Sequence, residues 1–269
     1  MTAISARETG DTGSAPPPEH VQSLERGLAV ICAFTPERPE LTLSDAARAI
    51  GVSRSTARRS LLTLQYLGYV AQVDGRFHLL PRVLDLGYAY LSSLGLPEIA
   101  QPHLEALTAD LHEASSVAVL DGSDIVYVNR VSTERIMRIT ISVGTRFPAY
   151  ATSMGRVMLA ARSDAWISEF LDRTPLEPFN ANTVTDRDKF MAVLADARSV
   201  GYSLVDQELE RGLRSIAVPI HNGRGDVIAA ANVSLYVISG SPQEIKRRVL
   251  TRLRQAADAI ERDLRSARH

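Results

Sequence analysis

Helix-start and helix-end signals follow one another closely in the first part of the chain, and their order admits few folds. Thr42 or Ser44 can cap the start of one helix, and Gly51 can supply the left-handed residue that ends it. Ser53 can then cap a second helix over residues 54–67. The sequence therefore predicts two short helices joined by a tight turn.

A further helix precedes these two, and a β-hairpin follows them. The second helix places three apolar residues at core spacing: Ala57, Leu61 and Leu64. The preceding helix, at 21–34, carries one apolar stripe: Leu24, Leu28, Ala29 and Ile31. Two short β runs flank Asp74-Gly75, a pair that readily adopts the positive φ values of a tight turn. This order is that of a winged helix-turn-helix domain, which we expect over residues 21–81.

Residues 97–269 change in character to alternating helices and strands and form an expected second domain. The predicted elements, in chain order, are a helix at 97–114, strands within SVAVLDGSDIVYVNRV and MRITISV, helices after Thr152 and at 186–201, strands RSIAVPI and VIAAANVSLY, and a last helix opened by a capping box of Ser241, Pro242 and Glu244. Hairpins outnumber βαβ units, so we expect an α+β protein whose second domain has a mainly antiparallel sheet with helices against it.

Between the two domains, residues 82–96 are predicted to form a linker helix. Leu84, Tyr88 and Leu91 share one face of it and belong by pattern to neither core. An uncovered apolar stripe indicates a partner, so we expect at least a homodimer through this helix. The residues before the first helix, rich in Gly, Ser, Thr and Pro, are expected to be a disordered tail. The expected division of the chain is 1–20, 21–81, 82–96 and 97–269.

Composition excludes several classes of protein. No apolar run approaches the ~18 residues of a membrane span, and the N-terminus lacks the apolar region of a secretory signal, so we expect a cytoplasmic protein without membrane contact. The six histidines show no ligand spacing, and the single cysteine, Cys32, is expected to be a buried, inert thiol of the first helix. We therefore predict no metal site, no disulfide and no cofactor.

Positive charge is concentrated at one end of the predicted second helix. Four arginines and no acid occur between residues 48 and 59, whereas the whole chain has a net charge of −1. That net charge argues against a protein that coats nucleic acid nonspecifically, so any DNA contact must be local. Because a recognition helix reads base edges with its N-terminal residues, the expected base contacts are Arg54, Ser55, Thr56, Arg58 and Arg59. Phosphates are expected to contact Ser53, the helix amides and Arg76 of the wing.

An alternative for this surface is the solvated, arginine-rich helix of a winged-helix domain that binds protein. The fold alone does not guarantee DNA binding. Such a face would more usually mix both signs of charge, however. We therefore favour double-stranded operator DNA as the partner.

The segment GTRFPAYATSMGRVMLA offers a place for an anion in the second domain. It ends in a helix whose first turn holds Thr152, Ser153, Met154, Gly155 and Arg156. A helix start presents free amides and the positive end of the dipole, which suit a carboxylate. Gly155 would let the backbone approach closely, and Arg146 or Arg156 could supply the counter-charge through a bidentate pair. The alternative is an ordinary capped helix that packs on the sheet, with Gly155 merely allowing close contact.

Four segments together resemble the IclR family of bacterial transcription regulators, and the last three most resemble its branch that contains PcaR, PcaU and PobR: VQSLERGLAVI, SRSTARRSLLTLQYLGYV, VGTRFPAYATSMGRVMLA and LERGLRSIAVPI. The resemblance implies an N-terminal winged helix, a GAF-like C-terminal effector domain, and homodimers or tetramers. It also implies control of genes for the catabolism of protocatechuate, 4-hydroxybenzoate or β-ketoadipate, and it ranks protocatechuate and β-ketoadipate about equally as effector.

The resemblance also implies the residues of an effector pocket. By motif position these are the loop from Ala151 to Gly155, including Ser153 and Met154, and three side chains of the sheet, Ser215, Asn232 and Ser234. Some family members hold a small acid there with a cysteine and an acidic residue. This chain has Ser215 at the cysteine position and Val205 near the acidic one, which suits a different acid. An IclR-type repressor that responds to an unrelated small acid is therefore the second hypothesis.

An enzyme is the competing class of function, with Ser153 as nucleophile. Such a serine needs a base within hydrogen-bond reach and a third group that orients the base. Ser153 lacks a G-x-S-x-G context, and no His or Cys occurs nearby in sequence. We therefore predict no catalytic residues and no enzymatic activity. A third class, an architectural DNA-binding protein without a ligand, is disfavoured by the size of the second domain.

Overall fold

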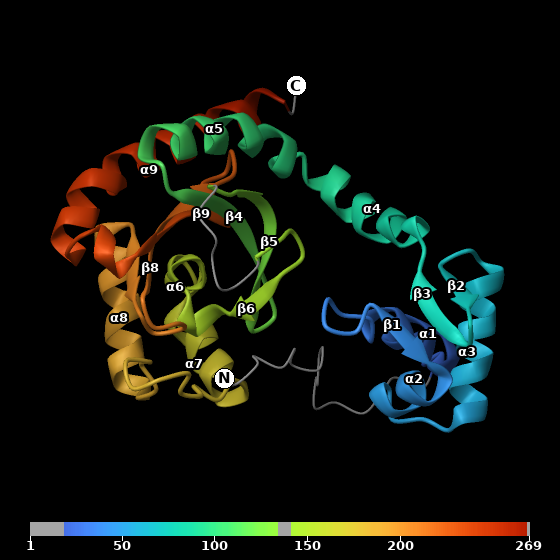
Figure 1. Cartoon of the computed structure of the whole chain (residues 1–269). Coiled ribbons are helices and arrows are strands. Elements are labelled where there is room, and N and C mark those ends of the chain that lie inside the picture. Colours follow the sequence, from blue (N-terminus) through green and yellow to red (C-terminus); the bar gives the residue numbers. More distant parts are fainter. Residues whose placement is uncertain (1–18, 134–140, 268–269) are drawn as a thin grey trace. The chain divides into compact units, whose positions relative to one another are not determined.

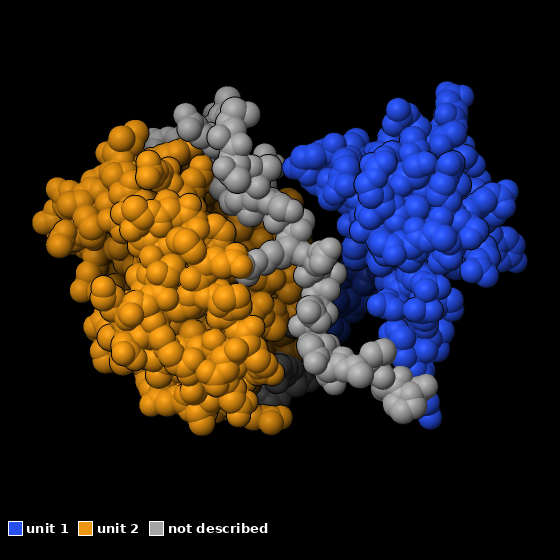
Figure 2. All heavy atoms as spheres, turned by 90° about the horizontal axis from the view of Figure 1, so that it is seen from below, with its two compact units in different colours: residues 1–93 blue, residues 94–269 orange. Residues whose placement is uncertain are grey.

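The computed structural model describes residues 19–133 and 141–267, which divide into two compact units, 1–93 and 94–269 (Figures 1 and 2). The sequence placed this boundary after residue 96. Each unit has its own buried core. No helix in the described ranges is both long and apolar enough to cross a lipid bilayer.

The described part of the first unit has four α-helices and a small sheet. Its elements are α1 (Gln22–Cys32), β1 (Glu40–Thr42), α2 (Leu43–Ala49), α3 (Arg54–Tyr66), β2 (Val70–Val73), β3 (Arg76–Leu79), the 3-10 turn η1 (Pro81–Val83) and α4 (Leu84–Leu94). The strands pair antiparallel in the order β1-β3-β2. The predicted helix-helix-helix-hairpin order is therefore confirmed, with β1 as an additional strand.

The caps of this unit follow from local sequence. Thr42 caps α2 through a capping box with Asp45, and Gly51 after it has φ of 65°. Ser53 caps α3, which buries Ala57, Leu61 and Leu64 against the core.

One prediction about the first helix is wrong. Cys32 lies at the end of α1 and is exposed rather than buried. The residue of α1 that enters the core is Val30, while Leu24 and Leu28 on the predicted stripe are also exposed. The apolar stripe of α1 is thus turned partly away from the core of its own unit.

The second unit is a six-stranded antiparallel sheet with helices on both faces. Its elements are α5 (Leu96–Leu111), β4 (Ala114–Asp121), β5 (Asp124–Val131), β6 (Arg146–Pro148), η2 (Ala149–Ala151), α6 (Ser153–Ala160), α7 (Asp164–Arg173), α8 (Arg187–Val200), β7 (Ser203–Asp206), β8 (Leu213–His221), β9 (Val227–Tyr236), η3 (Val237–Ser239) and α9 (Pro242–Ser266). The strand order is β6-β5-β4-β9-β8-β7. The predicted α+β class with a mainly antiparallel sheet is confirmed.

The sheet is curved, and the helices divide between its faces (Figure 1). The paired helices α5 and α9 cover the outer face, while α6 packs in the concave face against β8 and β9. The last helix begins at the predicted capping box of Ser241 and Glu244.

Two predicted stretches differ in the structure. The strand expected within MRITISV falls mostly on residues 134–140, outside the described residues, and its described end, 141–143, is not a strand. The linker expected at 82–96 is η1 followed by α4, and Gly95 with φ of 61° separates α4 from α5. A left-handed residue ends a helix, so Gly95 marks the division between α4 and α5.

Candidate nucleic-acid interface and ligand cavity

Hydroxyl groups cluster at the start of α3. The Ser53 Oγ accepts a hydrogen bond from the Thr56 amide at 3.2 Å and lies 2.9 Å from the Ser55 Oγ and 3.0 Å from the Thr56 Oγ1. Ser53 and Ser55 are exposed, while Thr56 is half-buried. Of these three predicted contacts, Thr56 therefore has the least surface to offer a partner.

The predicted arginines of α3 lie on its exposed side. Arg54, Arg58 and Arg59 are exposed, opposite the buried side that faces the core of the unit. Within the described part of the chain they form no ion pair, whereas the neighbouring Arg48 has its Nη1 3.4 Å from Asp45. A helix start that carries three uncompensated cations is suited to phosphates and to the acceptor-rich edge of guanine.

The wing residue Arg76 lies beside the start of α2. It opens β3 and pairs in register with Thr42 of β1. The pKa of Asp45 is lowered, first by hydrogen bonds from Thr42 and further by the charges of Arg48 and Arg76. Arg76 is exposed, so its charge is available to a partner.

A small cavity of about 40 Å³ lies in the second unit between the sheet and the start of α6. Strands β5, β7, β8 and β9 supply polar and apolar side chains to it, and the segments around η2 and between β7 and β8 close it. Its lining residues are Tyr127, Ile141, Phe147, Ala151, Thr152, Ser153, Met154, Val205, Glu208, Leu209, Glu210, Leu213, Ser215, Asn232 and Ser234. Five of the eight residues predicted for an effector therefore line one cavity.

Four of these five form a continuous chain of hydrogen bonds. The Ser153 Oγ lies 2.5 Å from the Ser215 Oγ, and the Asn232 Nδ2 donates to the Ser215 Oγ at 3.0 Å and to the Ser234 Oγ at 3.2 Å. Asn232 is only 2% exposed, and its Oδ1 accepts no hydrogen bond from any described residue. A buried acceptor without a donor is rare in folded proteins, and Asn129 outside the cavity has the other one among the described residues.

The first turn of α6 offers two amides to the cavity rather than three. Thr152 caps the helix, and its Oγ1 accepts from the Gly155 amide at 3.1 Å. A Cβ at position 155 would collide with the Ala149 carbonyl oxygen. Gly155 does not line the cavity and serves close contact between α6 and η2, which corrects its predicted role as a ligand contact. The amides that the cap leaves unengaged are those of Ser153 and Met154.

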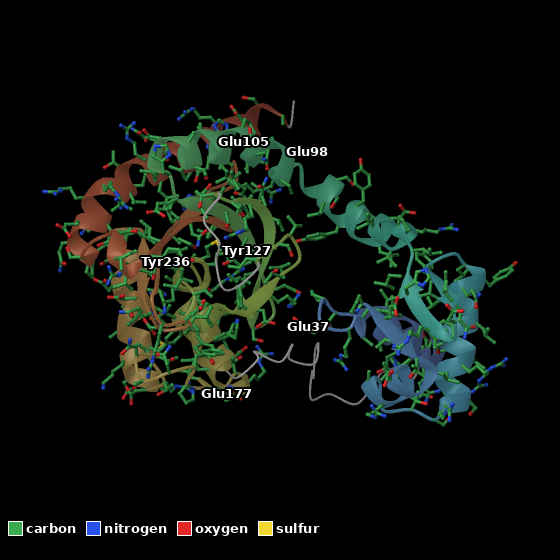
Figure 3. All side chains as sticks on the ribbon, in the orientation of Figure 1. Glu37, Glu98, Glu105, Tyr127, Glu177 and Tyr236 are labelled. Carbon is green, nitrogen blue, oxygen red and sulfur yellow. The ribbon has the colours of Figure 1, made fainter. Side chains whose placement is uncertain are left out.

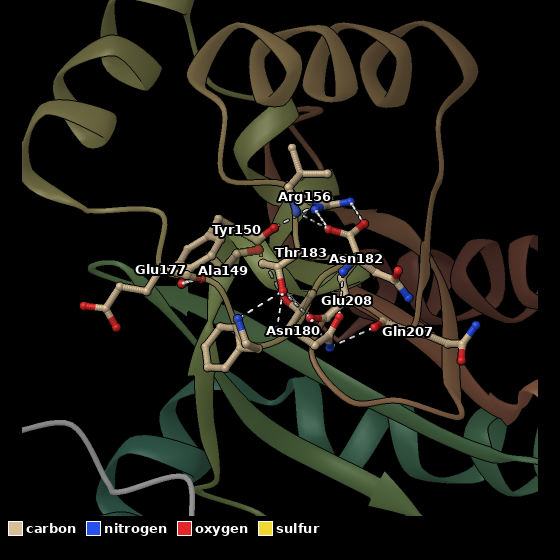
Figure 4. Close-up of polar contacts among 12 residues, drawn as sticks. Ala149, Tyr150, Arg156, Glu177, Asn180, Asn182, Thr183, Gln207 and Glu208 are labelled. Atoms are coloured by element: carbon tan, nitrogen blue, oxygen red, sulfur yellow. Dashed lines mark hydrogen bonds and ion pairs between the residues drawn. The ribbon is translucent and has the colours of Figure 1, made fainter. Parts of the chain in front are cut away.

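Neither arginine predicted as counter-charge lines the cavity. Arg156 is buried, and its Nη1 and Nη2 donate to the two carboxylate oxygens of Glu208 at 2.7 and 2.6 Å (Figure 4). Arg146 lies on β6 and donates to Asp121 and Asp124 at 2.7 and 3.3 Å. The bidentate geometry therefore exists, but its carboxylate belongs to the protein, and both arginines already pair with carboxylates outside the effector.

The ion pair of Glu208 continues into a wider network (Figure 4). The Val184 amide donates to the Glu208 carboxylate at 3.0 Å. The Glu208 carbonyl accepts from the Asn180 side chain at 3.0 Å and from the Thr183 hydroxyl at 2.7 Å. These bonds fix the segment between β7 and β8, which carries Leu209 over the cavity.

The sequence analysis missed an aromatic wall of the cavity. Tyr127 on β5 (Figure 3) is buried. Its ring packs edge-on against Phe147, with the ring centroids 6.0 Å apart. Burial raises the pKa of the Tyr127 phenol to about 12, so the hydroxyl keeps its proton. The alternation in DIVYVNRV predicted a strand there, but only the strand pairing shows which face holds the cavity.

Comparison with known proteins covers both units. Residues 23–74 match the family model of the IclR helix-turn-helix domain, and residues 88–262 match that of the bacterial transcriptional regulator IclR C-terminal domain. Over 235 aligned residues the chain is 46% identical to the Pca regulon regulatory protein of Pseudomonas putida. The alignment covers 87% of this chain and 80% of that protein.

Two solved structures are also similar to this chain over most of its length. A protein of Rhodococcus sp. RHA1 described as a transcriptional regulator is 51% identical, with a TM-score of 0.82 over 91% of this chain and 98% of that one. An IclR homolog of Microbacterium hydrocarbonoxydans in complex with 4-hydroxybenzoate is 29% identical, with a TM-score of 0.81 over 91% of this chain and 99% of that one.

Proposed function

The chain belongs to the IclR family of bacterial transcriptional regulators, and from that premise we propose that it controls genes of aromatic-acid catabolism in response to a small carboxylic acid. The similarity to the Pca regulon regulatory protein and to a homolog with 4-hydroxybenzoate supports this class of effector. Protocatechuate, 4-hydroxybenzoate and β-ketoadipate are the candidates.

The α3 surface carries the DNA-binding half of the proposal. The single observation behind it is that Arg54, Arg58 and Arg59 are exposed at the start of a capped helix and form no ion pair in the described part of the chain. Such a surface releases condensed counterions when it meets phosphates, and its arginines can read base edges. A regulator that reads operator DNA in a bacterium acts in the cytoplasm.

The effector half rests on the cavity under α6. In this proposal the carboxylate of the acid binds at the start of α6, where the dipole is positive and the amides of Ser153 and Met154 lie. The other end of the acid contacts Ser215, Asn232 and Ser234. We propose no catalytic role for Ser153, because its Oγ contacts the Ser215 hydroxyl, which cannot serve as a general base at neutral pH.

An operator-shift assay on the DNA upstream of the gene tests both halves. The full chain should shift that DNA, and protocatechuate, 4-hydroxybenzoate or β-ketoadipate should change the affinity. Failure to shift upstream DNA at any salt concentration would contradict the DNA-binding half. Unchanged affinity with all three acids would contradict the effector class.

A further inference from the structure

We propose that Arg82 couples the linker helix α4 to α3, the helix that reads the operator in the proposed function, so that a change in the direction of α4 turns α3. This inference rests on the proposed function and adds a positioning residue to it. Arg82 lies in η1, directly before α4 in the chain and outside the lining of the cavity under α6.

The end of α3 has a carbonyl group that the helix itself leaves free. The Tyr69 amide donates to the Leu64 carbonyl at 2.9 Å. The Gly68 amide donates to the Gln65 carbonyl at 3.0 Å, and Gly68 has φ of 79°, so α3 closes in a Schellman motif. These bonds do not use the carbonyl of Leu67, the C-cap residue. The negative end of the helix dipole therefore has an acceptor that suits a cation.

Arg82 binds this acceptor and is held at two points. Its Nη1 donates to the Leu67 carbonyl oxygen at 2.9 Å, and its guanidinium lies over the Tyr69 ring, 5.6 Å from the ring centroid. Its side chain also lies against Gly68, where a Cβ would stand 3.5 Å from the Nη1. A planar guanidinium can make the hydrogen bond and the ring contact together. The position of Arg82 is therefore fixed by the end of α3.

The helix α4 has little other attachment to the first unit. None of residues 84–93 is buried, and none belongs to the core of that unit. In the described part of the chain, Arg82 is the one residue of 81–93 whose side chain hydrogen-bonds to the chain before η1. The hydrogen bonds of the serine hydroxyls of α4 stay within that helix. The direction of α4 thus depends on Arg82 and on the backbone bond from the Leu80 amide to the Tyr69 carbonyl at 2.8 Å.

A displacement at one end of α3 reaches the other end because α3 is a single unbroken helix. Its 13 residues span about 20 Å at ~1.5 Å per residue. A tilt of about 10° at the end that Arg82 holds moves the opposite end by about 3 Å. The exposed Arg54, Arg58 and Arg59 lie toward that opposite end. Because hydrogen bonds tolerate only a few tenths of an ångström in length, such a tilt is enough to make or break contacts with bases.

The second unit contains the same arrangement at a place that does not lead into α4, and it provides a matched control. The end of α8 reads Val200-Gly201-Tyr202, and Gly201 has φ of 71°. The Arg254 Nη2 donates to the Val200 carbonyl at 2.7 Å, and its guanidinium lies 5.9 Å from the centroid of the Tyr202 ring. Arg82 and Arg254 therefore make the same two kinds of contact at a helix end, but only Arg82 precedes α4.

Fluorescence anisotropy on the full chain tests the coupling. The DNA upstream of the gene is titrated with the parent, Arg82→Ala, Arg82→Lys and Arg254→Ala, with and without protocatechuate, 4-hydroxybenzoate or β-ketoadipate. We expect at least one acid to change the operator affinity of the parent and of Arg254→Ala by about fivefold or more. The same acid should change the operator affinity of Arg82→Ala by less than about twofold, while calorimetry shows that the acid still binds that variant. Arg82→Lys should regain part of the response, because its ammonium can still donate to the Leu67 carbonyl.

Three outcomes of this titration would overturn the inference. The first is a parental response to the acid in Arg82→Ala. The second is an equal loss of operator affinity with and without acid, because Arg82 would then serve only as a helix cap or a phosphate contact. The third is an equal loss of the response in Arg254→Ala, since any uncapped helix end would then have the same effect. A parent that responds to none of the acids would contradict the proposed effector class, and a distance measurement then decides the inference by itself.

The distance measurement on the free protein needs neither DNA nor effector. Spin labels are attached at the exposed positions of Gln65→Cys and Ser92→Cys in a Cys32→Ser chain, which is diluted with unlabelled chain. Pulsed electron paramagnetic resonance then gives the distribution of distances between α3 and α4 within one chain. We expect a narrow distribution in the parent and in Arg254→Ala and a broad one in Arg82→Ala. An equally narrow distribution in Arg82→Ala would overturn the inference and leave the proposed function intact.

Discussion

At the scale of single residues, the described arginines include one that is buried and paired and others that are exposed on α3. Arg156 is 2% exposed and satisfied by Glu208 and the Tyr150 carbonyl, whereas Arg58 and Arg59 extend from α3 into solvent. Burial decides which role an arginine plays, since a buried cation requires a counter-ion and an exposed one can give its charge to a partner.

Removal of the Glu208 charge is expected to destabilise the second unit. In Glu208→Gln the buried Arg156 loses its counter-ion, and the free energy of unfolding should fall by about 3–5 kcal/mol. Chemical denaturation measures this. The control is Asp172→Asn, which removes an exposed pair with Arg187 and should cost less than about 1 kcal/mol. Equal effects of the two substitutions would contradict the role given to the buried pair.

The α3 arginines are expected to set operator affinity. Arg58→Ala or Arg59→Ala should weaken specific binding by about 1–3 kcal/mol and leave effector binding unchanged. Arg224→Ala removes an exposed arginine of the β8–β9 turn and serves as the control. A quantitative gel shift at matched salt compares the variants, and parental affinity in both α3 variants would show that α3 is not the reading helix.

The Tyr127 phenol is expected to titrate late. Its pKa in the folded protein, about 12, lies above the ordinary value of 10.0 for a tyrosine, so folding stabilises the neutral form. That stability is fully present below pH 10.0 and is lost as the pH rises toward about 12. A phenolate absorbance titration should show one late component that Tyr127→Phe removes. A variant that titrates like the parent would show that Tyr127 is not the late group.

At the scale of elements, the segment η2–α6 depends on the absence of a side chain at position 155. In Gly155→Ala the new Cβ would meet the Ala149 backbone, and the free energy of unfolding should fall by about 1–3 kcal/mol or more. Gly223→Ala is the control, because its Cβ would meet only the Arg265 side chain at 3.7 Å. Thermal unfolding of both variants decides whether close contact is the function of Gly155.

Local signals predicted most elements, and distant contacts decided the site. The caps at Thr42, Ser53 and Ser241 could be predicted because a cap depends on neighbours within three residues. The short strands β1, β6 and β7 were missed, since three or four residues carry too little periodicity to identify a strand.

At the candidate site, too, some residues could be placed from the sequence and others could not. Ser153, Ser215, Asn232 and Ser234 meet in the cavity as the resemblance implied. The partner of Arg156, however, lies 52 residues away in sequence and on another element. No local pattern of residues 146–156 could show that this arginine was already engaged.

At the scale of the whole molecule, α1 and α4 leave apolar side chains without cover. Leu84 is 72% exposed and Tyr88 67% exposed, and Leu24 and Leu28 of α1 are exposed as well. Exposed apolar stripes of this kind are typical of surfaces that associate. A symmetric pair of chains would also place two reading helices on two half-sites of an operator.

Disruption of the α4 stripe is expected to yield monomers. Leu84→Glu combined with Leu91→Glu places charge on the stripe, and sedimentation should then show one chain per particle where the parent shows two or four. Ser92→Glu, at an exposed polar position of the same helix, should leave the assembly intact. A parent that sediments as a monomer at micromolar concentration would contradict the proposed dimer.

The small volume of the cavity affects the measured dissociation constant of an effector. About 40 Å³ has room for roughly three water molecules, so a ligand of the size of benzoate would need the lining side chains to move apart. The measured dissociation constant is then the intrinsic constant divided by the fraction of open molecules. If about one molecule in a hundred is open, the effector must exceed its intrinsic dissociation constant about a hundredfold before half of the protein responds. Under the proposed function, a cavity that is mostly closed would raise the concentration of the acid at which the regulator responds.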